Sequence, residues 1–209
     1  MTVLNTVEPA TGLASLRRSP LADRAAEFAA SSADGLRGVR LSEEAFLTQV
    51  NLRVPPESPA LLAGLERELG LALPHRPNSV VGDERDAVLW LGPDEWLVIA
   101  PEGRADRVVS RARTAMADSV GSSVDVSADR TTVRLAGPVS RDVLEKVCSL
   151  DLHPRAFGAG QCARTLVGRV RVALWQVGAE PAYRLLVHCS FAGYLADLLL
   201  DAMAEFTHA

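Results

Sequence analysis

The side chains best suited to nucleophilic catalysis or metal binding are three cysteines and four histidines. No two cysteines stand at the short spacing of a metal knuckle or a redox motif, so we expect reduced, mostly buried thiols. His188 and Cys189 are neighbours on a predicted strand, which directs them to opposite faces and disfavours a nucleophilic pair. Cys189 could instead meet His75 or His153 in space. The complete set is Cys148, Cys162, Cys189, His75, His153, His188 and His208.

A second group with chemical potential is Asp125, Asp129, Arg130 and Arg134, around one predicted strand–loop–strand corner. Arginine offers two parallel donors to a carboxylate, so this corner could grip an acidic ligand. The alternative is a solvated corner with weak ion pairs. The glycine turns match neither a phosphate-binding loop nor the dinucleotide fingerprint, and a nucleophile elbow is absent from the sequence. The residues therefore predict no catalytic, cofactor-binding or metal-binding side chain.

The elements that would position these residues follow from the apolar pattern after residue 36. Alternation at every second residue predicts half-buried strands, and spacings of three and four predict amphipathic helices. Prolines and glycines mark where these elements end. In chain order the pattern predicts strands over residues 39–42 and 46–54, a helix over 61–69, a hairpin of strands 88–91 and 96–100, and a helix over 108–116.

The same order recurs in the second half of the chain. Val124–Ser127 matches Val39–Ser42 at an offset of 85 residues, and Trp175 follows Trp90 at the same offset. Two copies would bury in a common core the sheet faces that one copy covers poorly. The sequence therefore predicts an α+β fold, a mixed sheet with helices layered against it. The fold is predicted to be an internally duplicated strand-strand-helix-strand-strand-helix unit. The two copies are predicted to form one pseudo-symmetric domain over residues 36–209, with halves at about 36–118 and 119–207.

The duplication bears on two pairs of candidate residues. His75 and His153 follow equivalent helix exits, which favours a structural role for both. Trp90 and Trp175 are predicted to be core or sheet-face residues. If they were exposed they would instead mark a partner interface, because tryptophan is enriched in binding hot spots.

Residues 1–35 form a predicted N-terminal arm that is only partly ordered. Ser19-Pro20 could open a short helix with Leu21 and Phe28 on its apolar side, and residues 31–35 would end it. The arm either packs on the surface of the domain or docks on a partner. The residue pattern leaves both alternatives open.

Composition excludes several classes of protein. The length of 209 residues fits one domain or two small ones, and 48% of the residues are hydrophobic. With 22 basic and 26 acidic residues the net charge is −4, which argues against binding to nucleic acid or an anionic membrane. No apolar run approaches the roughly 18 residues that a membrane helix needs, and the start lacks the pattern of a secretion signal. We therefore expect a cytoplasmic protein.

Several motifs carry a family resemblance. Val124–Ser127, Val133–Pro138, Asp151 and Tyr183–Val187 together resemble the folate-binding aminomethyltransferases, the family of the glycine-cleavage T-protein. More closely, nearly the whole chain beyond the arm resembles the gamma subunits of heterotetrameric sarcosine oxidases. The stretches that carry this second resemblance are Ser19–Leu21, Leu91–Trp96, Gly137–Pro138, Cys148–Phe157, Gly160–Thr165 and Ser190–Leu195.

The closer resemblance implies a T-protein-like fold and membership of a sarcosine oxidase. Such an enzyme demethylates sarcosine to glycine, with hydrogen peroxide and formaldehyde or methylene-tetrahydrofolate as further products. It implies alpha, beta and delta subunits as partners, with FAD and FMN in beta, NAD and tetrahydrofolate in alpha, and zinc in delta. This chain would then be a non-catalytic gamma subunit without a cofactor or active site of its own, which stabilises or positions the folate-binding alpha subunit.

Two other functions remain open at this stage. One is a free-standing folate-dependent aminomethyl transferase. Transferases of that family place an acidic residue in a longer hairpin, whereas the link Gln176–Pro181 is short here and Glu180 is its one carboxylate. This departure favours the gamma-subunit interpretation. The other is a hydrolase based on cysteine or histidine, which buried and inert thiols would argue against.

Overall fold

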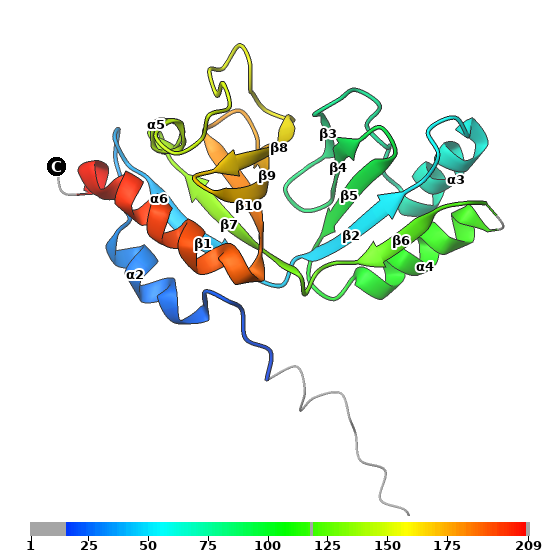
Figure 1. The fold of residues 1–209 in the computed structure, drawn as a ribbon, viewed down its shortest axis with the longest axis horizontal. Coiled ribbons are helices and arrows are strands. Elements are labelled where there is room, and N and C mark those ends of the chain that lie inside the picture. The colour runs from blue at the N-terminus through cyan, green and yellow to red at the C-terminus, as the bar shows by residue number, and fades with distance from the viewer. Residues whose placement is uncertain (1–15, 118, 208–209) are drawn as a thin grey trace, which may run out of the picture.

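The computed structural model describes residues 16–117 and 119–207, in which ten strands form two sheets with helices on their outer sides (Figure 1). In chain order the elements are η1 (Ala22–Arg24), α2 (Ala25–Ala30), β1 (Arg40–Glu44), β2 (Thr48–Arg53), α3 (Pro59–Leu69), β3 (Val80–Gly82), β4 (Ala87–Gly92), β5 (Glu95–Ala100), α4 (Ala105–Met116), β6 (Ser122–Asp125), β7 (Arg130–Ala136), α5 (Ser140–Glu145), β8 (Cys162–Val167), β9 (Val170–Gln176), β10 (Ala182–His188), η2 (Cys189–Phe191) and α6 (Ala192–Thr207).

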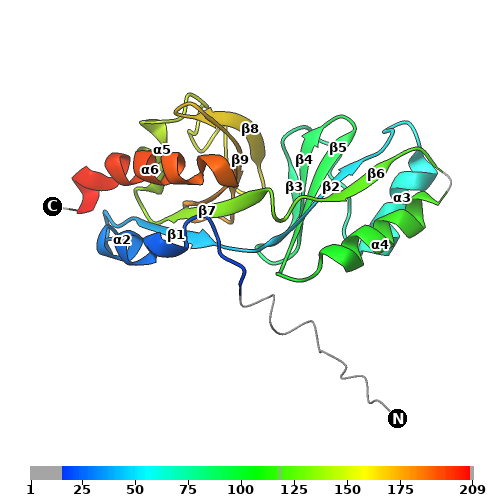
Figure 2. The same cartoon turned by 60° about the horizontal axis from the view of Figure 1, so that its bottom comes forward.

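Each sheet takes one edge strand from the other half of the chain. The first sheet has the order β3-β4-β5-β2-β6 and the second the order β1-β7-β10-β9-β8. Thus β1 pairs with β7, and β6 pairs with β2, all in antiparallel register. Figures 1 and 2 show the chain crossing between the sheets twice, from β1 to β2 and from β6 to β7. The halves therefore cannot separate without breaking both sheets.

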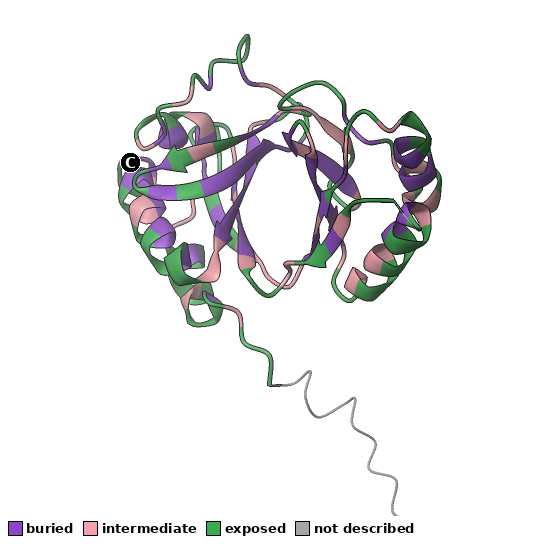
Figure 3. Cartoon of the chain, turned by 45° about the vertical axis from the view of Figure 1, so that its right-hand side comes forward, coloured by how far each residue is buried: buried purple, intermediate pink, exposed green. Residues whose placement is uncertain are grey.

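The two sheets face one another, and helices cover their outer faces (Figure 3). In the first sheet Val50, Leu52 and Val98 pack against apolar residues of α3 and α4. In the second, the outer face packs against α6 together with apolar residues of α2 and α5. A third apolar cluster, including Leu89 of β4 and Leu186 of β10, lies on the facing sides of the sheets. Burial on both faces explains why the central strands are almost continuously apolar.

Local sequence signals position the helices as expected. Leu61, Leu62 and Leu65 are buried on one side of α3. Pro59 lies in the first turn, where the backbone N–H that proline lacks would have no partner within the helix. Gly70 ends the helix with φ 73°, a left-handed conformation that glycine adopts without steric cost. The predicted hairpin 88–100 and the predicted helix over 108–116 are also confirmed.

The sequence predicts a mixed sheet, whereas the described residues build two sheets in which every strand pair is antiparallel. The predicted unit also lacks one strand in each half, β3 and β8. β3 has three residues, too few for alternation to be visible. In β8 the alternation of polar and apolar residues is weak, because apolar Leu166 lies on the same exposed face as Arg164, opposite buried Ala163.

The predicted equivalence of Trp90 and Trp175 is also wrong. Trp90 packs among the residues beneath α3 and α4, whereas Trp175 lies in the cluster between the sheets. An odd shift in register moves a strand residue to the opposite face. An offset of 86 residues, which aligns Ala87 with Ala173 and Leu89 with Trp175, keeps each residue in the inter-sheet cluster.

The described part of the arm packs on the second sheet. The predicted short helix is present as η1 and α2, with Leu21 and Phe28 buried in the outer core of that sheet. The Ser19 hydroxyl donates a hydrogen bond to the Glu43 carboxylate at 2.5 Å. Residues 1–15 lie outside the described residues, so the docking alternative stays a prediction. Within the described ranges, we find no helix with the length and apolarity needed to cross a membrane.

Candidate functional site

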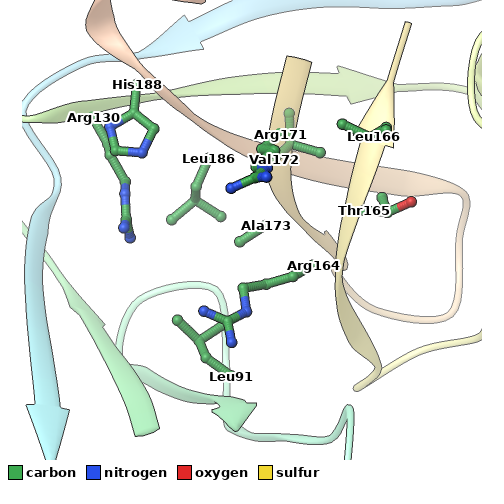
Figure 4. Close-up of a pocket in the computed structure, with 10 residues that line it drawn as sticks. All are labelled: Leu91, Arg130, Arg164, Thr165, Leu166, Arg171, Val172, Ala173, Leu186 and His188. Atoms are coloured by element: carbon green, nitrogen blue, oxygen red, sulfur yellow. The ribbon is translucent and has the colours of Figure 1, made fainter. Parts of the chain in front are cut away.

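An open pocket of about 570 Å³ lies between the two sheets and has an apolar floor and a cationic rim (Figure 4). Leu91 of β4 contributes from the first sheet, and Ala173 and Leu186 contribute from the second. Four of the remaining lining residues are arginines or a histidine, and the other three are Thr165, Leu166 and Val172. The four are Arg130, Arg164, Arg171 and His188.

Strand alternation directs the arginines into this pocket. In β9, Val170 and Val172 face the helix-covered core, so Arg171 between them points to the opposite side. In β8, Ala163 and Val167 face the same core, and Arg164 points toward the first sheet. The sequence analysis predicts neither arginine as a site residue. The signal in the sequence is a charged residue between apolar neighbours in each strand, which is equally typical of a strand with one solvent-exposed face.

The carboxylates of Glu95 and Asp129 lie beside three of these side chains, Arg164, Arg130 and His188. Buried Glu95 of β5 accepts hydrogen bonds from Arg164 at 3.1 Å, Arg53 at 2.9 Å and the Asn51 side chain at 2.9 Å. Asp129 lies 3.0 Å from His188 Nδ1 and 3.7 Å from Arg130 Nε. Arg171 makes no ion pair with any residue that the structure describes. The pocket therefore has a local excess of positive charge although the chain is acidic overall.

A separate network of charges ties the two halves together. Arg184 of β10 is 5% exposed and binds Glu44 of β1 through its Nε at 2.5 Å. It also donates to the backbone carbonyl of Glu84, in the loop between β3 and β4 of the first sheet, at 2.6 Å. Arg134 of β7 binds Glu44 at 3.2 Å and Glu84 at 2.9 Å. The first sheet's loop is thus held against two arginines of the second sheet.

The stability that Glu84 contributes is expected to depend on pH. Hydrogen bonding to Arg134 lowers the pKa of Glu84 below its usual value of 4.5. Since the folded-state pKa lies below the unfolded one, the contribution is fully present above about pH 4.5 and is lost as pH falls through the folded-state value. Glu84→Gln should therefore be less stable than the wild type near neutral pH and equal to it in acid. Urea titrations across this pH range measure the difference, and a gap that persists unchanged in acid would contradict the assignment.

The predicted Asp125–Arg134 corner does not form one site. The Asp125 carboxylate accepts hydrogen bonds from the backbone and hydroxyl of Ser127, and Arg134 is bound to Glu44 and Glu84. Only Arg130 lines the pocket, with Asp129 beside it. The reason is the length of β7, which places Arg134 four residues farther along the strand than Arg130. The ligand-gripping alternative is therefore wrong for this set, although Arg130 belongs to another arginine cluster.

The cysteines and histidines form no hydrogen-bonded pair within the described ranges. Buried Cys162 donates to the Trp90 carbonyl at 3.3 Å, and the Cys189 thiol donates to the Ala128 carbonyl at 3.5 Å. His75 and His153 are both exposed. In residues 16–117 and 119–207, no three His, Cys, Asp or Glu side chains lie together in a way that could hold a metal ion. The thiols are accordingly poor candidates for nucleophilic chemistry.

Cys162 is expected to resist alkylation in the native protein. Burial raises the pKa of Cys162 to about 12, so only about one thiol in ten thousand is ionised near pH 8. Burial and the nearby Asp129 and Glu43 carboxylates also raise the pKa of Cys189. Mass spectrometry after native iodoacetamide treatment measures the labelling, with urea-unfolded protein as the control that labels fully. Rapid native modification of Cys162 would show that the thiol is neither buried nor inert.

The fold defines the class of protein. The structure aligns with the glycine cleavage system aminomethyltransferase T from Bartonella henselae over 88% of this chain and 57% of that one, with a TM-score of 0.63. The identity of 14% makes this a likeness of fold alone. The chain therefore has a T-protein-like α+β fold, as the sequence predicts.

The comparisons also show the family. The model of the sarcosine oxidase, gamma subunit family matches residues 53–205. The sarcosine oxidase subunit gamma of Corynebacterium sp. (strain U-96) is 41% identical over 93% of each chain. A chain of the heterotetrameric sarcosine oxidase from Corynebacterium sp. U-96, solved in complex with pyrrole 2-carboxylate, is 40% identical, with a TM-score of 0.86 over 93% of this chain and 98% of that one. This chain belongs to the sarcosine oxidase gamma subunit family.

Proposed function

We propose that this chain is the non-catalytic gamma subunit of a heterotetrameric sarcosine oxidase. The observation that carries the proposal is the near-complete structural match to a chain of such an enzyme, at a TM-score of 0.86. The match covers 93% of this chain and 98% of the other. A protein conserved over its whole length in fold and at 40% of positions is well supported as a subunit of the same kind.

The proposed assembly oxidatively demethylates sarcosine to glycine. Hydrogen peroxide and either formaldehyde or methylene-tetrahydrofolate are the other products. We propose alpha, beta and delta subunits as the partners, with FAD, FMN, NAD, tetrahydrofolate and zinc held by those partners rather than by this chain. Its role would be to stabilise or position the folate-binding alpha subunit, in the cytoplasm.

The geometry supports a role without catalysis in this chain. Folate-dependent aminomethyl transfer needs a carboxylate positioned in the central cavity, but no Asp or Glu is among the described residues that line the inter-sheet pocket. The link Gln176–Pro181 is a short β9–β10 connection in which Glu180 is exposed. We therefore propose that no side chain of this protein acts as a catalytic, cofactor-binding or metal-binding group in sarcosine oxidation.

The exchange of edge strands supports treating residues 36–209 as one pseudo-symmetric unit with halves at about 36–118 and 119–207. Each half supplies a strand to the sheet of the other, so neither half has a complete sheet alone. Residues 1–35 would be the arm, of which the described part packs on the second sheet. Deleting residues 1–15 from the full chain is the simplest test of whether the start of the arm contributes to assembly.

Affinity purification of the tagged full chain from its native host is expected to recover a flavoprotein complex. The eluate should show the visible absorbance of bound flavins and should contain larger subunits in fixed proportion to this chain. The same tag on an unrelated protein of the host is the control. Recovery of the chain alone, while sarcosine oxidase activity remains in the flow-through, would contradict the proposal.

The T-protein fold makes a free-standing aminomethyl transferase the second candidate. It predicts that the purified chain both binds tetrahydrofolate and transfers an aminomethyl group. Turnover decides between the functions, because binding alone is compatible with a retained but inactive cavity. Aminomethyl transfer by the chain in the absence of other subunits would replace the gamma-subunit proposal.

A further inference from the structure

The inter-sheet pocket has the features of an anion-binding site that subunit assembly alone does not require. Arg130, Arg164 and Arg171 reach it from three different strands, and no carboxylate is among the side chains that line it in the described part of the chain. Figure 4 shows these arginines arranged around Leu186 and Ala173. Guanidinium groups bind carboxylates through two parallel hydrogen bonds, which gives such a cluster geometric selectivity.

The carboxylates nearby leave part of this charge without a partner. Glu95 binds Arg164 and also Arg53, so Arg164 shares its one described carboxylate with a second guanidinium group, which pairs with Asp94 as well. Asp129 lies 3.7 Å from Arg130 and 3.0 Å from His188. Arg171 makes no ion pair with the described residues. Arginines gathered around one pocket repel one another, and a bound anion would relieve that repulsion.

The apolar floor defines the body of the ligand. Leu91, Ala173 and Leu186 form a surface on which an inorganic ion would make no favourable contact. A volume of about 570 Å³ falls in the range of pockets that hold small organic molecules. Leu186 and Ala173 are 2% and 7% exposed, so the floor is part of the packed inter-sheet core and is already formed.

We propose that this pocket binds a small organic dicarboxylate, with its carboxylates on the arginines and its apolar body on the Leu91–Ala173–Leu186 floor. Arg171 of β9 is the principal unpaired donor, and Arg130 of β7 and Arg164 of β8, on strands to either side of it, supply the remaining positive charge. The proposal does not depend on the proposed function, because it concerns binding by this chain and not assembly or turnover. The floor distinguishes the ligand from a free phosphate, which would use the arginines alone.

Calorimetric titration of the full chain tests the site. The probes are benzene-1,3-dicarboxylate, its neutral diamide and inorganic phosphate. We expect saturable binding of the dicarboxylate that weakens as ionic strength rises, and no saturable binding of the diamide. Arg171→Gln should lower the affinity for the dicarboxylate by about tenfold or more, since it removes a charge-assisted hydrogen bond. Arg130→Gln, from a different strand, should lower it as well.

Arg169→Gln is the matched control. Arg169 is an exposed arginine in the β8–β9 turn, two residues from Arg171, and it does not line the pocket. It should leave the affinity unchanged, and thermal unfolding of the Arg169→Gln and Arg171→Gln variants should match the wild type because both arginines are exposed and make no described ion pair. Absence of saturable dicarboxylate binding, equal binding of the diamide, or equal losses in the Arg169 and Arg171 variants would each overturn the proposal. Phosphate binding as tightly as the dicarboxylate, or an Arg171→Gln effect on subunit assembly alone, would overturn it as well.

Discussion

Arg184→Ala is expected to lower the free energy of unfolding by about 3 to 5 kcal/mol, the range for breaking a buried ion pair from one side. The Arg184 side chain is 6% exposed and Glu44 is 22% exposed, so removing the guanidinium leaves a carboxylate with little access to water. The Glu84 carbonyl also loses a donor at 2.6 Å, and the ring of Trp175 loses the guanidinium that lies 5.1 Å away. Chemical unfolding of the full chain measures the loss.

Two comparisons make this result specific. Arg40→Ala removes an exposed pair with Asp34 and should change the stability by less than about 1 kcal/mol. Adding Glu44→Gln to an Arg184→Met variant should recover part of the loss, because it removes a carboxylate that would keep only Arg134, which it shares with Glu84, as a partner. If Arg184→Ala were as stable as Arg40→Ala, the charge network would not be what holds the two sheets together.

The second large effect is expected at Gly82, at the end of β3. Its φ is +110°, and an added Cβ would lie 2.1 Å from the Asp86 carbonyl oxygen and 2.8 Å from the Ala87 Cα. Both neighbours are backbone atoms and cannot rotate away. Gly82→Ala should therefore displace the β3–β4 loop, whose Glu84 binds Arg134, and lower the free energy of unfolding by at least about 3 kcal/mol.

Gly103→Ala separates the clash from backbone strain. Gly103 also has a positive φ, of +78°, but an added Cβ would meet nothing within 4 Å. This variant should cost only the strain of a left-handed residue, about 1 kcal/mol. Urea unfolding of both variants gives the comparison. Equal losses at Gly82 and Gly103 would mean that the loop adjusts freely and that its position is not defined by the packing around it.

Local signals in the sequence predict the helices and hairpins well because each depends on neighbouring residues. Leucine spacing and Gly70 define α3, and the apolar runs on either side of Gly92-Pro93-Asp94 define the β4–β5 hairpin. The family resemblance adds the T-protein-like fold, which the structural comparison confirms.

The exchange of edge strands between halves could not be predicted in the same way. The residues that link β1 to β2 resemble those of an ordinary tight connection, and which strand β1 pairs with depends on the complete tertiary arrangement. The alignment of β4 with β9 is a second feature that the sequence does not determine. Trp90 and Trp175 match in residue type, but only the burial of each tryptophan reveals which face of its sheet it occupies.

The pocket was missed for a related reason. The sequence around Arg164 and Arg171 is typical of strands with one solvent-exposed face. Nothing in the neighbouring residues indicates that a second sheet faces these two arginines. Conversely, the Asp125–Arg134 corner looked concentrated in sequence but is divided between different contacts in space. Charge clusters that come from several strands become visible only when the strand order is known.

Reconstitution with and without this chain tests the central claim most directly. The alpha, beta and delta subunits would be co-expressed with the full chain, and the product separated by size-exclusion with light scattering and assayed for sarcosine-dependent hydrogen peroxide. We predict one species that contains all four subunits and oxidises sarcosine, while this chain purified alone does not. A fully active assembly that excludes the chain, or sarcosine turnover by the chain in isolation, would contradict the account.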